Sequence, residues 1–388
     1  MEQNEAVSIV RGIMLEFANS TGLADARKPP SRYLWTDAFA LCNFLALFRG
    51  TGEDSWRQLA DKLVFQVHHT LGRHRDDDPR SGWISGLGAA DGELHPTRGG
   101  LRIGKLLSER RAGDPLNERL EWDRDGQYYH YLTKWMHALC RMGCVTGNHV
   151  FTDWALELAQ TAHDRFVHVL PADDRKMIYW KMSIDLRRPL IPAMGQHDPL
   201  DGLVTCCELR AAAGETAASA WPGLDDAAAD LAGICKEVEW MTADPLGIGG
   251  LLFDARRMAQ LIAGGGFGDG TLLESALDAA LAGLHSFAAD NPLKYRARQR
   301  LAFRELGLAI GLKGIARCRS FIADNPQYFS EKIIQRVGAL AEYEQLAEII
   351  ERFWLDSGNR DADSWKEHRE INMVMLATSL APDEFLTI

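Results

Sequence analysis

Two kinds of helical hydrophobic pattern alternate along the chain, and this alternation limits the possible folds more than any other feature. The segment 54–71 places its apolar residues on one stripe, which is typical of a helix with one solvent-exposed face. The preceding segment, 35–48, is apolar on almost every side, which is typical of a helix buried all round. Both patterns recur, in dense segments at 127–144, 301–315 and 365–380 and in one-sided segments at 151–166, 273–284 and 331–353.

Buried helices that alternate with half-exposed ones require that one set be enclosed by the other. A ring of inner helices wrapped by outer helices meets this requirement, whereas an up-and-down bundle leaves every helix half-exposed. Strand-type alternation is almost absent. Gly307, Gly311 and Gly314 would let helices approach one another closely. We therefore predict an all-α toroid of inner and outer helices, an (α/α)6 barrel, in which residues 1–388 form a single domain.

Charge and cysteine content argue against several classes of protein. The chain has 388 residues and a net charge of −11 without a basic patch, so we expect no nucleic-acid partner. Its seven cysteines are irregularly spaced, which indicates reduced core thiols in a cytoplasm and no metal site. No apolar run approaches the roughly 18 residues of a membrane span, and no signal peptide is recognisable. We predict a cytoplasmic protein with no membrane partner, metal or cofactor, and the sequence leaves its oligomeric state open.

The least regular stretch runs from Arg73 to Arg119 and is rich in glycine, proline and charge. A loop of this length in a compact domain is usually functional or disordered, and we predict an ordered rim loop with Trp83 as a substrate-binding candidate. Its acidic run from Asp76 to Asp78 could hold Mg²⁺ and a diphosphate, although a solvated turn is the ordinary explanation of such a run.

The first candidate site opens the first buried helix. Arg32, Tyr33 and Trp35 precede Asp37 there, at the point where the chain becomes wholly apolar. Asp37 could be an acid, a base or a ligand for a sugar hydroxyl, with the other three residues binding the substrate. The alternative is that Asp37 or Thr36 caps the helix, because the first N–H groups of a helix lack partners.

The second candidate site opens the dense segment that begins at residue 127. Gln127, His130, Lys134 and His137 follow one face by steps of three and four residues, on a helix that is otherwise aromatic and apolar. Burying such a stripe is costly unless each group has a partner, so a water-filled lumen would explain it. The alternatives are an exposed stripe or partnered core histidines. Further candidates in this region are Asp123, Asp125, Tyr128 and Trp135.

Two weaker candidates open later helices. His197 and Asp198 lie together before one helix, where a histidine beside carboxylates could act as an acid or base, or where the run could simply cap the helix. Trp365 and His368 begin the last dense segment and could bind substrate, although solvated charge is the ordinary explanation of that run.

These clusters, "RYLWTDAF", "EWDRDGQYYHYLTKW" and "GQHDPLDG", together with the helix alternation, resemble the six-hairpin glycosidase superfamily of (α/α)6 toroids. The resemblance is architectural and covers most of the chain. It implies inner helices that run parallel, so that their N-termini meet at one mouth. Members include glycoside hydrolases, uronyl hydrolases, polysaccharide lyases and sugar 2-epimerases. No family-defining motif matches residue by residue, so the resemblance assigns no catalytic residue.

Our leading hypothesis is a metal-independent glycoside hydrolase that acts on a small-molecule or oligosaccharide substrate. Glycoside cleavage needs two carboxylates about 5–10 Å apart. The candidates are Asp37, Asp123, Asp125, Asp198 and Glu93, and our hypothesis names Asp37 with Asp123 or Asp125. His130 and Arg32 would orient the substrate. The predicted stacking wall consists of Tyr33, Trp35, Tyr128 and Trp135, and Gln127 and Lys134 would add polar contacts.

Three other functions stay open. A sugar epimerase or isomerase would use His130 with His197 or His368 as proton carriers. An isoprenoid cyclase would need Mg²⁺ at Asp76–Asp78. A non-enzymatic helical binding scaffold would expose the polar stripe of 127–137 to solvent.

Overall fold

The computed structural model describes residues 3–25, 27–171, 174–214, 221–268 and 270–388. The chain divides into two compact units. Unit 1 comprises Met1–Phe17 and Glu239–Ile388, and unit 2 comprises Ala18–Val238. The single domain expected for residues 1–388 remains a prediction.

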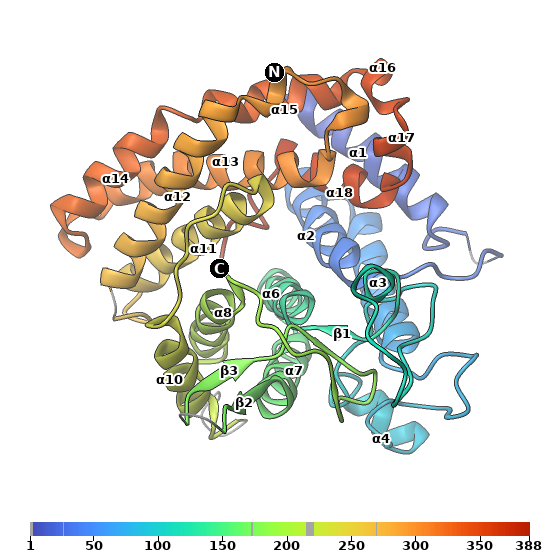
Figure 1. Cartoon of the computed structure of the whole chain (residues 1–388). Helices are drawn as coiled ribbons and strands as arrows, with labels where there is room; N and C mark the ends of the chain where they lie inside the picture. Colours follow the sequence, from blue (N-terminus) through green and yellow to red (C-terminus); the bar gives the residue numbers. More distant parts are fainter. Residues whose placement is uncertain (1–2, 26, 172–173, 215–220, 269) are drawn as a thin grey trace. The chain divides into compact units, whose positions relative to one another are not determined.

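Unit 2 is built from buried helices covered by one-sided helices (Figure 1). The buried helices are α2 (Leu34–Thr51), α6 (Tyr129–Thr146) and α8 (Asp198–Ala213). The helices with one buried face are α3 (Asp54–Leu71), α7 (Val150–Phe166) and α10 (Leu224–Cys235). Helix α6 packs against α2, α7 and α8, while α3 packs on α2 and α10 packs on α8. The alternation of patterns in the sequence thus corresponds to real differences in burial.

Local signals set the ends of these helices. Helix α2 begins after Tyr33, whose extended backbone leaves its N–H free to donate to the Asp37 carboxylate (2.9 Å). It ends where Gly52 adopts a left-handed conformation (φ 71°), a common helix C-terminus for glycine. Gly147 ends α6 in the same way (φ 70°). The entrances of α2 and α6 are therefore fixed by residues close in sequence.

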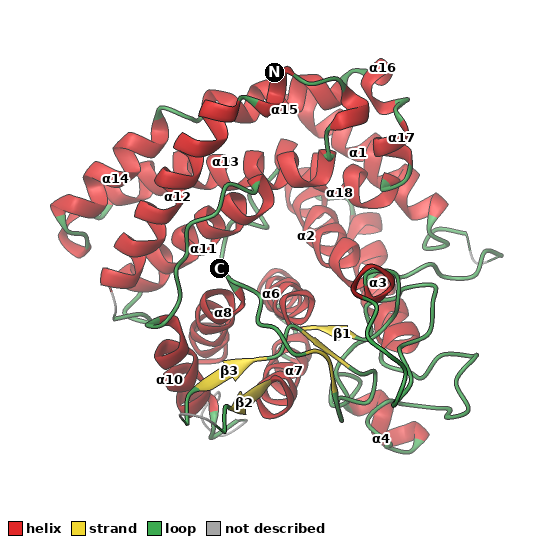
Figure 2. Ribbon diagram, in the orientation of Figure 1, coloured by secondary structure: helices red, strands yellow, loops and turns green. Residues whose placement is uncertain are grey.

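Short strands accompany the helices of unit 2 (Figure 2). Strands β1 (Gln127–Tyr128), β4 (Lys181–Met182) and β5 (Pro189–Ile191) form an antiparallel sheet in the order β1-β4-β5. Strands β2 (Val167–Val169) and β3 (Lys176–Ile178) form an antiparallel pair. Strands of two or three residues are too short to show an alternating pattern, which is why the sequence did not predict them.

The stretch 73–119 is irregular apart from α4 (Ala89–Leu94) and the beginning of α5 (Glu118–Glu121). Isolated bridges pair Arg73 with Trp83 and Leu107 with Arg124. The segment is thus an ordered loop held by its own contacts, as the sequence predicts.

Unit 1 has the same two classes of helix. The buried helices are α11 (Pro245–Ala263), α13 (Ala302–Asp324) and α18 (Arg369–Leu380). The one-sided helices are α12 (Gly270–Asp290), α14 (Glu331–Ala341) and α15 (Gln345–Leu355). Shorter elements are α16 (Ser357–Arg360), α17 (Asp363–Lys366), η2 (Pro292–Lys294), η3 (Ala297–Gln299) and η4 (Pro326–Tyr328). Helix α1 (Gln3–Ser20) starts in unit 1 and ends in unit 2.

Glycine allows α11 and α13 to pack closely. A Cβ atom on Gly249 would lie 2.2 Å from the carbonyl oxygen of Gly307, and one on Gly311 would lie 2.7 Å from that of Gly249. Real Cβ contacts are not this short, so only glycine permits the observed approach. The expected close approach at Gly307 and Gly311 is confirmed. At Gly314 it is wrong, because a Cβ atom there would lie 3.4 Å from its nearest neighbour, an ordinary contact.

Two helix predictions in unit 1 are wrong in their extent. The helix expected over 331–353 is two helices, α14 and α15, separated by a turn at 342–344. The buried stripe keeps its period across the turn, from Leu340 to Ala347, so the hydrophobic pattern gives no sign of the break. The helix expected over 365–380 is likewise divided, because Trp365 belongs to α17 and α18 starts at Arg369.

Two further findings bear on the predicted environment. Among the described residues, no helix combines the length and hydrophobicity that crossing a bilayer requires. Cys144 is exposed and the other cysteines are buried, which agrees with the expectation of core thiols.

Candidate functional site

Aromatic side chains gather at the entrances of α2 and α6 in unit 2. We call Tyr33, Trp35, Tyr128, His130, Tyr131 and Trp180 the aromatic cluster. Tyr33 and Tyr131 share a hydrogen bond between their hydroxyl groups (2.6 Å), and Trp35 lies 5.3 Å from Tyr131 between ring centroids. Trp180 joins from the sheet, because the Tyr129 N–H donates to its carbonyl and its ring stacks on Tyr128 (5.0 Å). The cluster thus combines side chains from the entrances of α2 and α6 with Trp180, which lies between β3 and β4.

His130 lies among the rings of the aromatic cluster. Tyr128 stacks on its imidazole (5.4 Å between centroids), and the Trp180 ring is nearly parallel to it, at 7° and 6.4 Å. Trp35 and Tyr131 present their rings at 68° and 89°. Burial, and then the charge of Lys134, lower the pKa of His130 to about 4. The imidazole is therefore neutral at neutral pH, and its side chain remains 27% exposed.

Asp198 faces His130 from the first turn of α8. Its Oδ1 lies 3.7 Å from His130 Nδ1, beyond hydrogen-bond distance. Within the described residues, His130 Nδ1 and Asp198 Oδ2 are buried atoms without a hydrogen-bond partner. Burial, and then the charge of Asp201, raise the pKa of Asp198 to about 7. A protonatable carboxyl and a neutral imidazole thus lie side by side.

A glycine makes room for this carboxyl. A Cβ atom on Gly195 would lie 2.4 Å from Asp198 Oδ2, and the Asp198 N–H donates to the Gly195 carbonyl (3.2 Å). Any larger residue at position 195 would push the Asp198 side chain aside. The run "GQHDPLDG" therefore positions the carboxyl as well as starting α8, with His197 as the half-buried N-cap residue.

Asp201 lies one turn further along α8 in a different electrostatic environment. Lys134 Nζ is 2.6 Å from its Oδ1, and the Thr133 hydroxyl donates to its Oδ2. These partners stabilise the ionised form of Asp201. Asp198 and Asp201 are three residues apart on a helix, so they share a face. Neighbouring carboxyls whose environments differ in this way are suited to different roles in acid–base chemistry.

Asp37, a predicted catalytic carboxylate, lies inside the α2 entrance. Its Oδ1 accepts a hydrogen bond from Arg32 (3.1 Å) and its Oδ2 accepts one from the Tyr33 backbone (2.9 Å). Arg32 is buried and also donates to the Thr21 carbonyl (2.9 Å). Burial raises the pKa of Asp37 to about 6, and the charge of Arg32 opposes the shift. The structure therefore favours the capping alternative, in which Asp37 and Arg32 hold Tyr33 in place.

Asp125, another predicted catalytic residue, is the anchor of the 73–119 loop. It is fully buried and accepts hydrogen bonds from Arg102 (2.5 Å) and Arg75 (3.2 Å). The backbone N–H groups of Gly104 and Lys105 donate to its other oxygen (3.0 and 3.3 Å). These contacts leave it no freedom to act on a substrate.

Other predicted residues of the 121–137 region point in several directions. Asp123 is exposed. Gln127 and Trp135 are fully buried, and Trp135 donates to His68 (3.2 Å), so Trp135 belongs to the core and not to a stacking wall. His137 pairs with Glu208 (2.7 Å) away from solvent. The polar stripe is thus largely a set of partnered core groups, and His130 is its most exposed imidazole.

The loop candidate Trp83 is also buried, at 3% exposure. The Arg73 guanidinium lies 4.6 Å above its ring, and a Cβ on Gly92 would overlap it. Trp83 therefore packs the loop against itself.

The sequence analysis did not predict a role for two tryptophans, Trp180 in the aromatic cluster and Trp122, which extends the cluster outward. Trp122 is 55% exposed and meets Trp180 edge to face, at 4.8 Å and 66°. A continuous run of rings thus leads from His130 through Tyr128 and Trp180 to solvent at Trp122. Trp180 lies between two strands of two or three residues, where no periodicity marks it. Trp122 lies in the motif "EWDRDGQYYHYLTKW", but the sequence does not show that its side chain is exposed.

The predicted substrate-binding residues of unit 1 lie in or near its core. Trp365 is 4% exposed and stacks on Trp354 (5.6 Å), and its carbonyl accepts a hydrogen bond from Asn372 (3.0 Å). His368 is the N-cap residue of α18 and meets Phe303 edge to face (5.3 Å).

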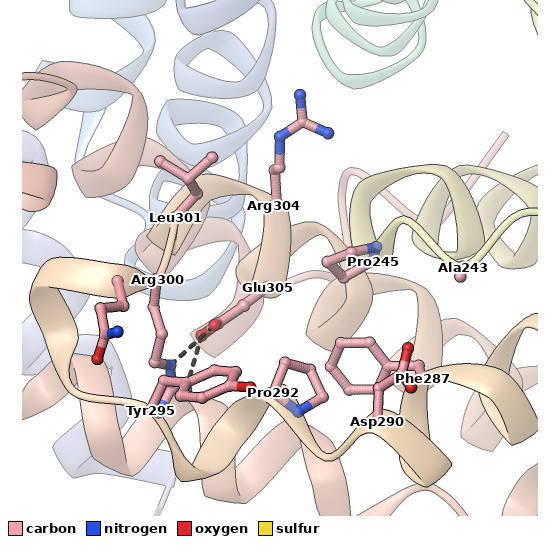
Figure 3. A pocket seen from close by; sticks show the side chains of 11 residues that line it. Ala243, Pro245, Phe287, Asp290, Pro292, Tyr295, Arg300, Leu301, Arg304 and Glu305 are labelled. Carbon is pink, nitrogen blue, oxygen red and sulfur yellow. Dashed lines mark hydrogen bonds and ion pairs between the residues drawn. The ribbon is translucent and has the colours of Figure 1, made fainter.

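Unit 1 also contains a cavity of about 290 Å³ at the entrance of α13 (Figure 3). Tyr295, Pro292 and Phe287 line one side of it. On the other side Arg300 and Glu305 form two hydrogen bonds (2.8 and 2.7 Å), and Trp354 donates to the same carboxylate (2.8 Å). Arg300 and Glu305 thus bind each other, and Arg304, also in the lining, binds Asp244 (2.7 Å).

The acidic run in the loop is held by arginines. Arg75 lies 2.6 Å from Asp77, and Arg80 lies 2.8 Å from Asp78. Hydrogen bonds from Arg75 and Ser108 lower the pKa of Asp77 to about 2. Among the described residues there is no group of three or more histidine, cysteine or acidic side chains that could hold a metal ion.

Comparison with known proteins gives structural matches and no sequence match. No family model and no curated protein matches the chain. A GH76 α-mannanase from Bacteroides thetaiotaomicron is 10% identical with a TM-score of 0.54, covering 100% of this chain and 97% of that one. A cellobiose 2-epimerase from Spirochaeta thermophila is 12% identical with a TM-score of 0.50, covering 95% and 97%.

The chain shares its fold with these two structures. The predicted all-α toroid fold is thereby confirmed, and the resemblance noted in the sequence agrees with it. Identities of 10% and 12% show the fold alone and leave the reaction of this chain to its own residues.

Proposed function

We propose that the chain is a carbohydrate-active enzyme in which Asp198 and His130 transfer protons. The observation that carries the proposal is that His130 Nδ1 and Asp198 Oδ2 lack hydrogen-bond partners within the described residues, although both atoms are buried. Unpartnered buried polar atoms are costly, and they persist where a ligand completes them. The pKa of Asp198, raised to about 7, adds the property expected of a catalytic acid at neutral pH.

The aromatic cluster suits a sugar. Sugar rings stack their C–H faces on aromatic side chains and use their hydroxyl groups for hydrogen bonds. Tyr33, Trp35 and Trp180, which are partly exposed, supply the rings, and Asp198 with His130 supplies the polar contacts. Tyr128 is 3% exposed and supports His130 and Trp180 by stacking on them. Trp122 offers an exposed ring for a second sugar unit, which favours an oligosaccharide over a monosaccharide.

Glycoside hydrolysis is the reaction that we propose first. Asp198 is the acid, and Asp201, which binds Lys134, is the second carboxylate. Residues three apart on a helix have Cβ atoms about 5–6 Å apart, and glycoside cleavage uses carboxyl groups about 5–10 Å apart. We propose this pair in place of Asp37 with Asp123 or Asp125, because Asp198 has a buried oxygen without a hydrogen-bond partner in the described part of the chain. A mannanase shares the fold along this whole chain.

Sugar epimerisation is the second candidate. The specific observation in its favour is the 3.7 Å approach of a neutral imidazole to a protonatable carboxyl, a pair that could remove and return one proton. A cellobiose 2-epimerase has the same fold.

The remaining alternatives lack support. A cyclase would need Mg²⁺ at the acidic run, where Arg75 and Arg80 already occupy Asp77 and Asp78. A binding scaffold would expose the stripe of 127–137, whereas Gln127 and His137 are buried.

The test compares Asp198→Asn with Asp123→Asn on a panel of manno- and cello-oligosaccharides. Removal of a general acid typically lowers the rate by about 10²–10⁴, so we expect that loss for Asp198→Asn, with an unchanged circular dichroism spectrum. Asp123→Asn is the matched control, because Asp123 is exposed, and it should keep normal activity.

Product analysis separates the two reactions. New reducing ends indicate hydrolysis, and a changed configuration without cleavage indicates epimerisation. Full activity in Asp198→Asn would refute the assignment of the acid, and loss only in Asp123→Asn would restore the earlier hypothesis.

A further inference from the structure

A small polar cavity lies on another part of unit 2. It has a volume of about 160 Å³, and three separate segments enclose it. Ser85 and Arg98 come from the 73–119 loop, Thr161 and Arg165 come from the C-terminal half of α7, and Arg187 comes from the connection between β4 and β5. Three arginines from three segments therefore converge on one cavity, in a chain whose net charge is −11.

These arginines differ from several buried and half-buried arginines of unit 2 in their partners. Arg98 Nε is 4.0 Å from the nearest Glu157 oxygen, and Arg187 Nε is 3.9 Å from Asp185, both beyond hydrogen-bond distance. Within the described residues, no side-chain hydrogen bond or ion pair is found for Arg165. By contrast, Arg32, Arg75, Arg80, Arg102 and Arg110 each donate a hydrogen bond to a carboxylate. The three arginines of the cavity are exposed, so their guanidinium groups are open to a ligand from solvent.

The walls of the cavity are joined by hydrogen bonds from side chains to backbone carbonyls. The buried amide of Gln127 donates to the Gly99 carbonyl (3.0 Å) and to the Ile184 carbonyl (2.7 Å), and so joins two of the walls. The Thr161 hydroxyl donates to the Arg98 carbonyl (3.1 Å) and joins the third. A Cβ atom on Gly99 would lie 2.4 Å from the Ser85 nitrogen, so the loop backbones touch.

The cavity lining contains one acidic side chain, Asp185. Asp185 accepts hydrogen bonds from Arg80 (2.7 Å) and from the Ser183 hydroxyl (2.7 Å). Burial opposes the shift, but these hydrogen bonds and the charges of Arg80 and Arg187 hold the pKa of Asp185 below its usual value. Three arginines therefore face one carboxylate in the lining, which leaves the cavity positive.

We propose that this cavity binds a tetrahedral oxyanion, either phosphate itself or the phosphate group of a sugar phosphate. Planar guanidinium groups give charge-assisted hydrogen bonds to such oxygens, and Ser85 and Thr161 add hydroxyl groups. The cavity is smaller than the roughly 300–1,000 Å³ of pockets for drug-sized ligands, which fits a small anion or one end of a larger molecule. The site is separate from the Asp198–His130 pair and does not depend on the proposed reaction.

The test measures the affinity of the full chain for inorganic phosphate by calorimetry, with chloride at equal ionic strength as the reference. Wild type should bind phosphate and should gain thermal stability from it, since a ligand of the native state raises stability by mass action. Arg165→Gln and Arg187→Gln should each weaken phosphate binding by about tenfold or more, because each removes a charge-assisted contact. Arg119→Gln is the matched control, since Arg119 is exposed and lies outside the cavity lining, and its affinity should equal that of wild type.

A second arm compares phosphate, a hexose 6-phosphate and the unphosphorylated hexose. Tighter binding of the hexose phosphate identifies a sugar phosphate as the ligand, and equal binding of both anions identifies the free oxyanion. Asp198→Asn should bind phosphate normally, which separates this site from the proposed reaction. Phosphate binding that equals chloride binding, or that is unchanged in both Arg165→Gln and Arg187→Gln, would overturn the proposal.

Discussion

The entrances of α8 and α13 both bury charged side chains, but they differ in how those side chains are partnered. At α13, Arg300 and Glu305 bind each other through two hydrogen bonds, and Trp354 completes the carboxylate. At α8, Asp198 and His130 approach to 3.7 Å, and each keeps a buried atom without a hydrogen-bond partner in the described part of the chain. The first arrangement stabilises a fold, and the second leaves capacity for a ligand. We therefore distinguish the α8 entrance by its unpartnered atoms together with the aromatic cluster beside them.

The largest expected effect on stability comes from breaking the Arg300–Glu305 ion pair. Arg300→Ala leaves Glu305 as a buried carboxylate without its cation, and breaking a buried ion pair costs about 3–5 kcal/mol. Arg304→Ala is the matched control, because Arg304 pairs with Asp244 at 38% and 35% exposure, where the cost is about 1 kcal/mol or less. Chemical denaturation of both variants measures the difference. Equal losses of stability in the two variants would mean that the buried Arg300–Glu305 pair stabilises the fold no more than the exposed Arg304–Asp244 pair does.

The pH dependence of the free energy of unfolding should reveal the raised pKa of Asp198 at the α8 entrance. The folded state holds the Asp198 proton with a pKa of about 7, well above the ordinary value for an aspartate, 3.8. The folded state therefore binds this proton more tightly than the unfolded state does. The contribution of Asp198 to the free energy of unfolding is complete below about pH 4 and is lost as the pH rises to about 7. We expect Asp198→Asn to flatten the wild-type curve of unfolding free energy over this window. A curve that is identical in the two proteins would contradict the raised pKa.

The smallest expected effect on stability lies at the outer end of the aromatic run. Trp122→Ala removes a half-exposed side chain, so it should change the free energy of unfolding by less than about 1 kcal/mol. If Trp122 binds a second sugar unit, the same change should raise the KM of an oligosaccharide several-fold and leave that of the shortest substrate unchanged. An equal rise for substrates of every length would place Trp122 in general support of the cluster instead.

The fold was predictable because its signals are local. The stripe of 54–71 gave α3 its observed bounds, and the dense 35–48 segment lies within the buried α2. The break between α14 and α15 was not predictable, since the stripe stays in phase across the turn.

The candidate site was predictable only in part, because partners come from distant segments. Asp198 and His130 stood out through their positions at helix entrances. Asp125 looked equally suitable, and only the structure brings Arg75 and Arg102 to it from 50 and 23 residues away. Trp180 carried no signal, because it reaches the cluster through a sheet too short to predict.

The most direct test of the account is a ¹³C NMR titration of the Asp198 side-chain carboxyl, assigned by comparison with Asp198→Asn. The account predicts a midpoint near pH 7, and a lower midpoint in Asp201→Asn, because that change removes the neighbouring negative charge. A midpoint near pH 4 in the wild-type protein would contradict it, since Asp198 would then be ionised at neutral pH and could not serve as the acid.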